Sequence, residues 1–283
     1  MRKLTILLLS LLITPAVFGQ AQINTKKVKI ADFTQKTTKV VLTGNMFYDS
    51  ALQDEIATRW RISPYEFCSL EEFENLKSDS RYYFLITTKG QFKRENEPGL
   101  TFLTLVKGGS DAAGGIDKML EVVSFPLAAA EDPSGREFIY LSAFMDIIQN
   151  YVIDSMDKDF NAYGGLGNYC LDLPKTAGMT IVFSEDDLSS LDEMTRKLYF
   201  NDSMIIEDED STDMHITENS ENTIVSYTVA PSAPVPGSYC YKMLIDTRNH
   251  RLYYFKKHRM TSRNGNGFLP DDIRRISAFR SRK

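Results

Sequence analysis

The distribution of apolar and polar residues predicts a chain of alternating strands and helices. The apolar run at residues 40–42 predicts a strand, which a glycine turn connects to a helical pattern. Leu52, Ile56 and Trp60 recur every four residues in that pattern, so we expect one face of the helix to be buried. Ser50 begins a capping-box pattern and is therefore the expected N-cap of this helix.

Further strands and a long helix are predicted in the first part of the chain. Apolar runs bounded by polar or glycine-rich segments predict strands. Apolar residues at helical spacing between Glu137 and Met156 predict a long amphipathic helix. The strands are expected at residues 65–69, 81–88, 100–106 and 119–127.

The second part of the chain begins with a similar strand and helix. A strand is predicted at residues 179–183. The helix after it is expected to be capped by Asp186 or Asp187, and its apolar face includes Met194 and Leu198.

Both parts share the order strand, helix, strand, acidic connector, strand, hairpin, helix. Val40 and Arg81 are as far apart along the chain as Ile181 and Asn222, so corresponding elements lie at matching separations. Similar orders arise by chance in α/β chains, but the matching separations favour an internal duplication.

The predicted fold is therefore α/β, or α+β in strict usage, with two similar tandem domains. Each domain is expected to contain a mixed β-sheet and two main helices. The expected boundaries are residues 22–156 for the first domain, 157–178 for a Gly/Asp-rich linker and 179–283 for the second domain.

The first residues have the pattern of a secretory signal peptide. Arg2 and Lys3 precede an apolar run at residues 4–17, and the small residue Ala21 suits a cleavage site before Gln22. The run is shorter than the roughly 20 residues that span a bilayer, and no second run of that length follows. We therefore expect residues 1–21 to be removed and the mature protein, without a transmembrane anchor, to be periplasmic or secreted.

The net charge of the chain argues against one class of partner, nucleic acids. The formal net charge is −5, and removing the two cations of the leader makes the mature chain more acidic. An acidic protein repels phosphate backbones, so no nucleic-acid partner is expected.

The turns after the first strand of each part do not resemble nucleotide sites. A dinucleotide turn needs closely spaced glycines that let backbone amides approach the phosphates. Gly44 stands alone, and the second part has Ser-Glu-Asp-Asp at residues 184–187 instead. Both turns are expected to be scaffold.

One stretch of the linker partly matches a calcium loop. Asp157, Asp159 and Asn161 occupy the first, third and fifth positions of such a loop. However, Ala162 replaces the usual glycine and Asn168 replaces the bidentate glutamate, so a solvated linker is the alternative. Calcium is the one cofactor that the sequence suggests.

Cys68, Cys170 and Cys240 are far apart in the sequence. Export permits a disulfide, and Cys170 with Cys240 is the pair that the sequence favours, whereas Cys68 ends a strand-like run and is expected to be a buried thiol. None of the three histidines has zinc-ligand spacing to a cysteine.

A basic segment near the C-terminus is a candidate binding surface. Lys256, Lys257, Arg259 and Arg263 follow a run of aromatic residues. We interpret them as a surface for an acidic envelope protein or an anionic envelope surface, with an ordinary exposed hairpin face as the alternative.

Two stretches resemble a known group of proteins. "RISPYEFCSLEEFENLKSDSRYYFL" at residues 61–85, and "CYKMLIDTRNHRLYYFKKHRM" with "GFLPDDIRRI" within residues 240–276, resemble an uncharacterised family of exported Bacteroidetes proteins. The element order is remotely similar to the N-terminal domain of the translocation protein TolB. The resemblance implies export but no functional residues.

The function expected from the sequence is that of a non-enzymatic binding or interaction protein of the bacterial cell envelope. It would use the groove between the two domains or the basic C-terminal segment. An exported hydrolase is one alternative, with its chemistry supplied either by a scattered pair of carboxylates or by Cys170 as nucleophile and one of His215, His250 and His258 as base. A calcium-binding or small-ligand-binding module at the linker is another.

Overall fold

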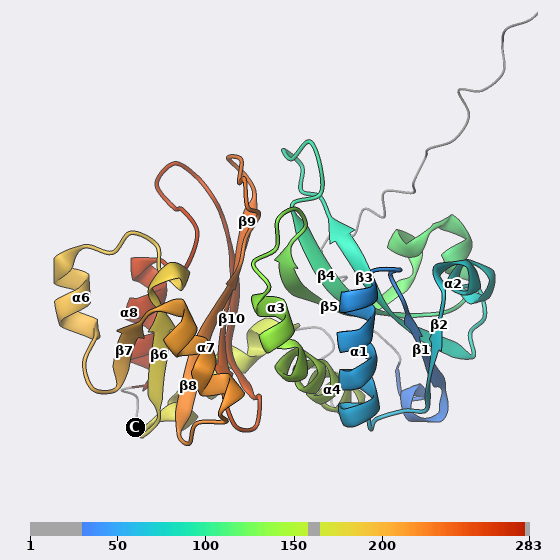
Figure 1. Cartoon of the computed structure of the whole chain (residues 1–283), viewed down its shortest axis with the longest axis horizontal. Helices are drawn as coiled ribbons and strands as arrows, with labels where there is room; N and C mark the ends of the chain where they lie inside the picture. Colours follow the sequence, from blue (N-terminus) through green and yellow to red (C-terminus); the bar gives the residue numbers. More distant parts are fainter. Residues whose placement is uncertain (1–29, 158–164, 281–283) are drawn as a thin grey trace, which may run out of the picture.

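The computed structural model describes residues 30–157 and 165–280, which form two halves built around separate β-sheets (Figure 1). The elements of the first half are β1 (Thr37–Val41), α1 (Met46–Arg59), β2 (Tyr65–Cys68), α2 (Leu70–Leu76), β3 (Tyr82–Gly90), β4 (Leu100–Lys107), β5 (Leu120–Ala129), α3 (Arg136–Ile139) and α4 (Leu141–Asp157). Those of the second half are η4 (Leu166–Thr176), β6 (Thr180–Ser184), α6 (Glu193–Tyr199), β7 (Met204–Glu207), α7 (Glu209–Thr217), β8 (Thr223–Val229), β9 (Tyr239–Asp246), β10 (Leu252–Arg259) and α8 (Pro270–Arg280).

The two sheets have the same topology. The strand orders are β2-β1-β3-β4-β5 and, for the second sheet, β7-β6-β8-β9-β10. In each sheet the first strand pairs in parallel with both strands that follow it, and an antiparallel meander completes the sheet. The predicted α/β fold is confirmed, and the shared topology is consistent with a tandem duplication.

Helix α1 begins earlier than the sequence pattern indicated. Its N-cap is Asn45, whose side chain accepts hydrogen bonds from the amides of Phe47 and Tyr48. The prediction of Ser50 as the cap is wrong, because the Asn45 cap starts the helix one turn sooner and places Ser50 within it.

The corresponding helix of the second half is shorter and less buried. Helix α1 has 14 residues and α6 has 7, and Asp192 caps α6 in place of the expected Asp186 or Asp187. Met194 and Leu198 are 75% and 61% exposed, so this part of the predicted apolar face is not covered, whereas Leu191, which the same pattern includes, is buried.

Both acidic connectors are helices rather than loops. Ser69 caps α2 by accepting a hydrogen bond from the amide of Glu72, and Asp208 caps α7 by accepting one from the amide of Ser211. Acidic residues in the first turn of a helix interact favourably with its dipole. This explains why acidic residues gather at the same place in each half.

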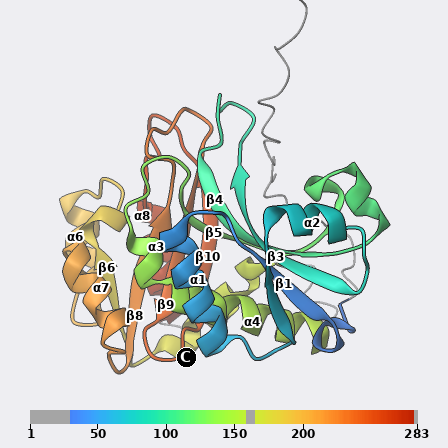
Figure 2. The same ribbon diagram turned by 45° about the vertical axis from the view of Figure 1, so that its right-hand side comes forward.

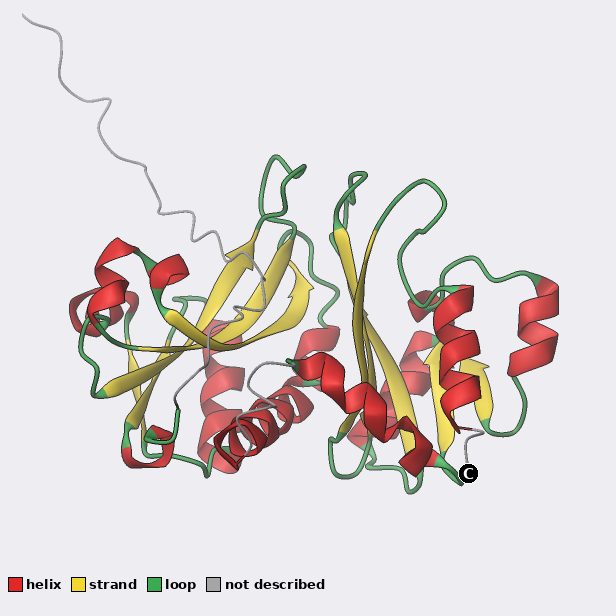
Figure 3. Ribbon diagram, turned by 180° about the vertical axis from the view of Figure 1, so that it is seen from behind, coloured by secondary structure: helices red, strands yellow, loops and turns green. Residues whose placement is uncertain are grey.

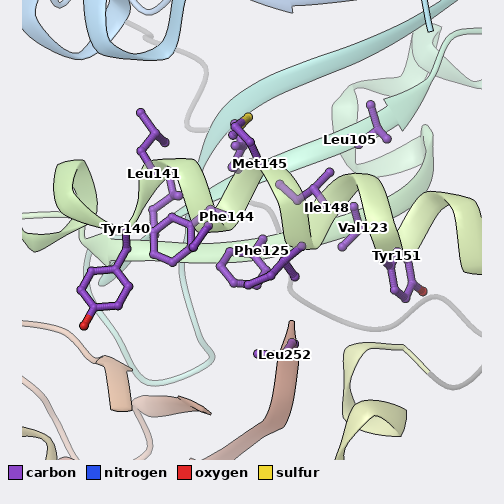
Figure 4. Close-up of a cluster of buried hydrophobic side chains, with 14 of the residues drawn as sticks. Leu105, Val123, Phe125, Tyr140, Leu141, Phe144, Met145, Ile148, Tyr151 and Leu252 are labelled. Atoms are coloured by element: carbon purple, nitrogen blue, oxygen red, sulfur yellow. The ribbon is translucent and has the colours of Figure 1, made fainter. Parts of the chain in front are cut away.

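Helix α4 lies between the two sheets and joins their cores. Its apolar residues contact β4 and β5 of the first sheet, and Leu252 of the second half approaches from the opposite side (Figure 4). Tyr227 of β8 reaches Tyr140 and Phe144 at ring-centroid distances of 4.5 and 5.3 Å. Viewed from behind, the two sheets stand side by side (Figure 3). The two halves therefore share one continuous apolar core.

The other faces of the sheets are covered within each half. On the first sheet, α2 packs against Val41 and Phe84. On the second sheet, Ile273 and Ile276 of α8 pack against Phe183. Each sheet is thus covered on both faces.

A buried ion-pair network also connects the halves. Arg136 of the first half is 7% exposed, and its guanidinium donates two hydrogen bonds to Asp213, of 2.9 and 2.7 Å, and one of 3.1 Å to Asp187. Asp187 also accepts hydrogen bonds from Ser226 and Thr228, both of 2.6 Å. Two buried carboxylates of the second half are therefore paired with one arginine of the first, which also lies 3.2 Å from the carboxylate of Glu209.

We expect the substitution Arg136→Met to lower the free energy of unfolding by about 3–5 kcal/mol, because it leaves two buried carboxylates without their cation. The matched control is Arg196→Met, which removes an exposed partner of Glu185 and should cost less than about 1 kcal/mol. Urea denaturation of both variants measures the difference. Equal effects of the two substitutions would contradict this role for Arg136.

Candidate functional site

A pocket of about 400 Å³ lies where the two halves meet at the linker. Helix α4 forms one wall, η4 forms another, and the turn between β9 and β10 closes the site. Ile153 provides accessible apolar surface, and the buried side chains of Ile147 and Leu252 lie beneath it. The volume falls within the usual range for small-molecule sites, about 300–1,000 Å³.

Polar groups converge on this apolar surface from all three elements. Asn150 and Asp154 lie one turn apart on α4 and therefore share a face of the helix. Tyr169 of η4 donates a hydrogen bond of 2.9 Å to the Asp154 carboxylate. Burial and the nearby Asp154 charge raise the pKa of Tyr169 well above its usual value, so its hydroxyl remains a donor.

The turn between β9 and β10 is held in place by its own side chains. The Asp246 carboxylate accepts hydrogen bonds from the amides of Arg248 and Asn249, of 2.9 and 3.1 Å. The Asn249 side chain in turn accepts one of 2.8 Å from the amide of Arg251. These bonds fix Asn249 and Arg251 at the edge of the pocket.

A buried histidine, His250, connects this turn to helices α1 and α4 of the first half. His250 is 4% exposed, and its Nδ1 lies 2.6 Å from the Asp146 carboxylate of α4. Arg59 of α1 donates to the same carboxylate oxygen at 2.9 Å. Because the contacts come from three elements, the wall of the pocket is rigid.

Arg251 forms an ion pair at the edge of the pocket. Its guanidinium bonds to Asp172, which also pairs with Lys175 at 2.6 Å. Burial opposes ionisation of Asp172, but hydrogen bonds from Lys175 and Arg251 outweigh it and lower its pKa. The edge of the site therefore carries balanced charges.

A second pocket, of about 360 Å³, lies among the loops above the sheets. The β3–β4 loop, Glu131 and the β8–β9 loop line it. The carboxylate of Glu95 is already bonded to the amide of Phe92 at 2.9 Å. Loop backbone supplies much of its lining, so the first pocket, built from packed elements, is the stronger candidate.

The four basic residues identified in the sequence are distributed over different surfaces. Strand alternation places Lys257 and Arg259 on the side of β10 that faces the first half, and Lys256 on the side that faces α8. Lys256 lies over the ring of Tyr254, and Arg263 lies in the exposed loop that follows β10.

Lys257 lies between the two sheets. Its ammonium group is 5.1 and 5.6 Å from the ring centres of Tyr239 and Tyr241. It also faces Glu121 of β5, whose pKa rises to about 7 because burial outweighs a hydrogen bond from Ser124 and the charge of Lys257.

The three cysteines are free thiols in the structure. Cys170 contacts the backbone of Phe255, whereas Cys240 pairs with His258 across the strands. Those two positions on β10 are three residues apart, about 10 Å along a strand, which is too far for a disulfide between Cys170 and Cys240. Cys68 is buried as expected, and burial raises its pKa to about 11.

The histidines that the hydrolase alternative requires are held in three separate places. His215 lies between Glu207 and Ser220, His250 contacts Asp146, and His258 bonds to the carbonyl of Gly265. Burial raises the pKa of Cys170, so its thiol is not activated as a thiolate.

The proposed calcium ligands Asp159 and Asn161 lie outside the described residues, as does the side chain of Asp157. Within the described part of the chain, no three His, Cys, Asp or Glu side chains are grouped in a way that suits a metal ion. No helix in residues 30–157 and 165–280 has the length and apolar character of a membrane span.

Most residues of the pocket were not identified from the sequence. Asp154 and Asn249 lie in unrelated elements, and nothing in their local patterns marks them as neighbours. The one available signal was the position of the linker, which predicted a ligand site near Asp157 and Asn168. The same applies to Arg136, which lies just before the predicted amphipathic helix and was not identified from the sequence.

The chain matches no protein-family model, and no curated protein or solved structure matches it either. The resemblance of residues 61–85 and 240–276 to exported Bacteroidetes proteins therefore stays a prediction, as does the remote similarity to the TolB domain.

Glu121 predicts a pH dependence of stability. Its pKa is about 7 in the folded protein and 4.5 in a free side chain, so between these values the folded state binds more protons than the unfolded state. The free energy of unfolding should therefore decrease as the pH rises from about 5 to 7. In the variant Glu121→Gln, the free energy of unfolding should decrease by about 1–3 kcal/mol less over this pH range.

Urea denaturation at several pH values, comparing Glu121→Gln with the native chain, measures this contribution. Glu131→Gln is the control, because Glu131 is an exposed partner of Lys89. An identical pH dependence of the native chain and Glu121→Gln would refute the assignment.

Proposed function

We propose that the protein is an exported binding protein of the bacterial cell envelope and that the pocket between its halves is its ligand site. The observation that carries the proposal is the construction of this pocket. Helix α4 of the first half and η4 and the β9–β10 turn of the second half contribute side chains, and apolar surface is combined with a few convergent polar groups. The signal-peptide pattern of residues 1–21 supports export.

The lining defines the chemistry of the ligand. Ile153, which lines the pocket and is 40% exposed, suits an apolar part of the ligand. The Asp154 carboxylate accepts hydrogen bonds, and the side chains of Asn150 and Asn249 both donate and accept them. A small ligand with hydroxyl or amide groups and little net charge fits this combination.

The surroundings of the pocket also favour binding over chemistry. His250 is nearly inaccessible and is already bonded to Asp146. Arg251 is neutralised by Asp172. The charged groups near the site thus hold its walls in position, which reduces the conformational entropy that is lost when a ligand binds.

Filling the pocket should abolish ligand binding. Ile153 lines the site and is 40% exposed, so Ile153→Trp should occupy part of the space without disturbing the core. The control is Ile139→Trp, at a residue of similar exposure on α3, 43%. A library of sugars, amino acids and short peptides is tested by thermal denaturation and calorimetry.

We expect at least one compound to stabilise the native chain and Ile139→Trp, by about 2.7 kcal/mol at 100 times its Kd. Its affinity for Ile153→Trp should be at least about tenfold weaker. If every compound that binds the native chain binds Ile153→Trp equally well, the pocket is not the site.

Export is tested separately from ligand binding, by locating the N-terminus of the mature protein. Mass spectrometry of the protein recovered from outside the cytoplasm should show an N-terminus at Gln22, and Ala21→Arg should block this cleavage because signal peptidase requires a small residue there. Recovery of full-length chain in the cytoplasm alone would contradict export.

A further inference from the structure

A cluster of large apolar side chains is exposed on one face of the molecule, away from the pocket. Met46 and Phe47 at the start of α1 are 84% and 86% exposed. Phe138 and Ile139 of α3 are each 43% exposed, and Met214 of α7 is 55% exposed. We call these five residues the apolar patch.

The three helices that carry the apolar patch are neighbours. Helix α3 lies between α1 and α7 in two views that differ by 45° (Figures 1 and 2). The rings of Tyr48 and Phe138 are 6.3 Å apart, which joins α1 to α3. Arg136 joins α3 to α7 through Asp213. The patch therefore extends across both halves.

The backbone under the apolar patch is fixed. The Asp49 carboxylate accepts hydrogen bonds of 2.8 Å from the amides of Thr43 and Gly44, so it holds the start of α1. The Arg136 network holds α3 against α7. Exposed side chains on a rigid backbone form a preorganised surface, which lowers the entropic cost of binding.

The segments around the apolar patch are acidic. Residues 43–54, 130–139 and 208–218 contain ten Asp or Glu residues, and Arg136, which is buried, is the one Lys or Arg among them. Six of the acidic residues are exposed: Asp54, Glu131, Asp132, Asp208, Asp210 and Glu218. The surface thus combines apolar anchors with an uncompensated negative charge.

We propose that the apolar patch is the docking surface for a basic amphipathic helix of a partner protein. Such a helix has an apolar face that covers the patch and Lys or Arg residues that meet the acidic surround. Methionine and phenylalanine are suited to this use, since flexible and aromatic side chains adapt to a helical partner. An anionic membrane is disfavoured, because the acidic surround would be repelled by its surface.

A labelled 18-residue peptide of Leu and Lys, with one apolar helical face, is a suitable probe. Fluorescence anisotropy with the full chain should give micromolar affinity that weakens as salt is added. The double variant Phe47→Ser/Phe138→Ser should bind at least about tenfold more weakly. Its matched control is Met194→Ser/Leu198→Ser, which removes exposed apolar residues of α6 and should bind like the native chain.

A second variant separates the charge from the apolar contact. Asp132→Lys/Asp210→Lys should also weaken binding, by about tenfold or more, without changing the apolar residues. Circular dichroism confirms that each variant is folded. Ile153→Trp should bind the peptide normally, which distinguishes this surface from the pocket.

Three results would overturn the proposal. The first is equal peptide affinity of the native chain and Phe47→Ser/Phe138→Ser. The second is binding to vesicles of phosphatidylglycerol that depends on the apolar patch, which would assign it to a membrane. The third is self-association that Phe47→Ser/Phe138→Ser abolishes in sedimentation experiments, which would assign the patch to a second copy of the chain.

Discussion

The pairing of two buried carboxylates with Arg136 is the constraint on which the arrangement of the halves depends. Asp187 follows the carboxyl end of β6 and is bonded to Ser226 and Thr228 of β8. Burying such a carboxylate without a cation would cost several kcal/mol, so the second half requires the arginine that the first half supplies. The halves therefore behave as one unit, although their topologies repeat.

The position of this network also explains where ligands are not bound. In open α/β sheets, ligands usually bind beyond the carboxyl ends of parallel strands, at the point where the connections from neighbouring strands run to opposite faces of the sheet. In the second half, Arg136 fills that place. In the first half, the Asp49 carboxylate accepts hydrogen bonds from the amides of Thr43 and Gly44 at the corresponding place. With both positions occupied by the protein's own groups, the proposed ligand site and docking surface lie elsewhere, along the junction of the halves.

The outline of the fold was predictable because the periodicities of strands and helices are local properties of the sequence. The strand that contains Val40 and the helix that contains Leu52 and Ile56 are as expected. The helix caps were less predictable, because several polar residues near Asn45 are acceptable caps and packing selects among them. The exposure of Met194 could not be predicted either, because an apolar pattern does not specify whether another element packs against the apolar face.

The sequence by itself determined the order of elements and the repetition of that order, since both depend on residues close together in the chain. The tertiary structure decided which distant residues meet. Arg136 and Asp213 are 77 positions apart, and His250 and Asp146 are 104 apart. Their contacts, the pocket and the apolar patch all depend on how one half packs against α4 of the other. That packing is set by the shapes and charges of whole surfaces, which no local pattern encodes.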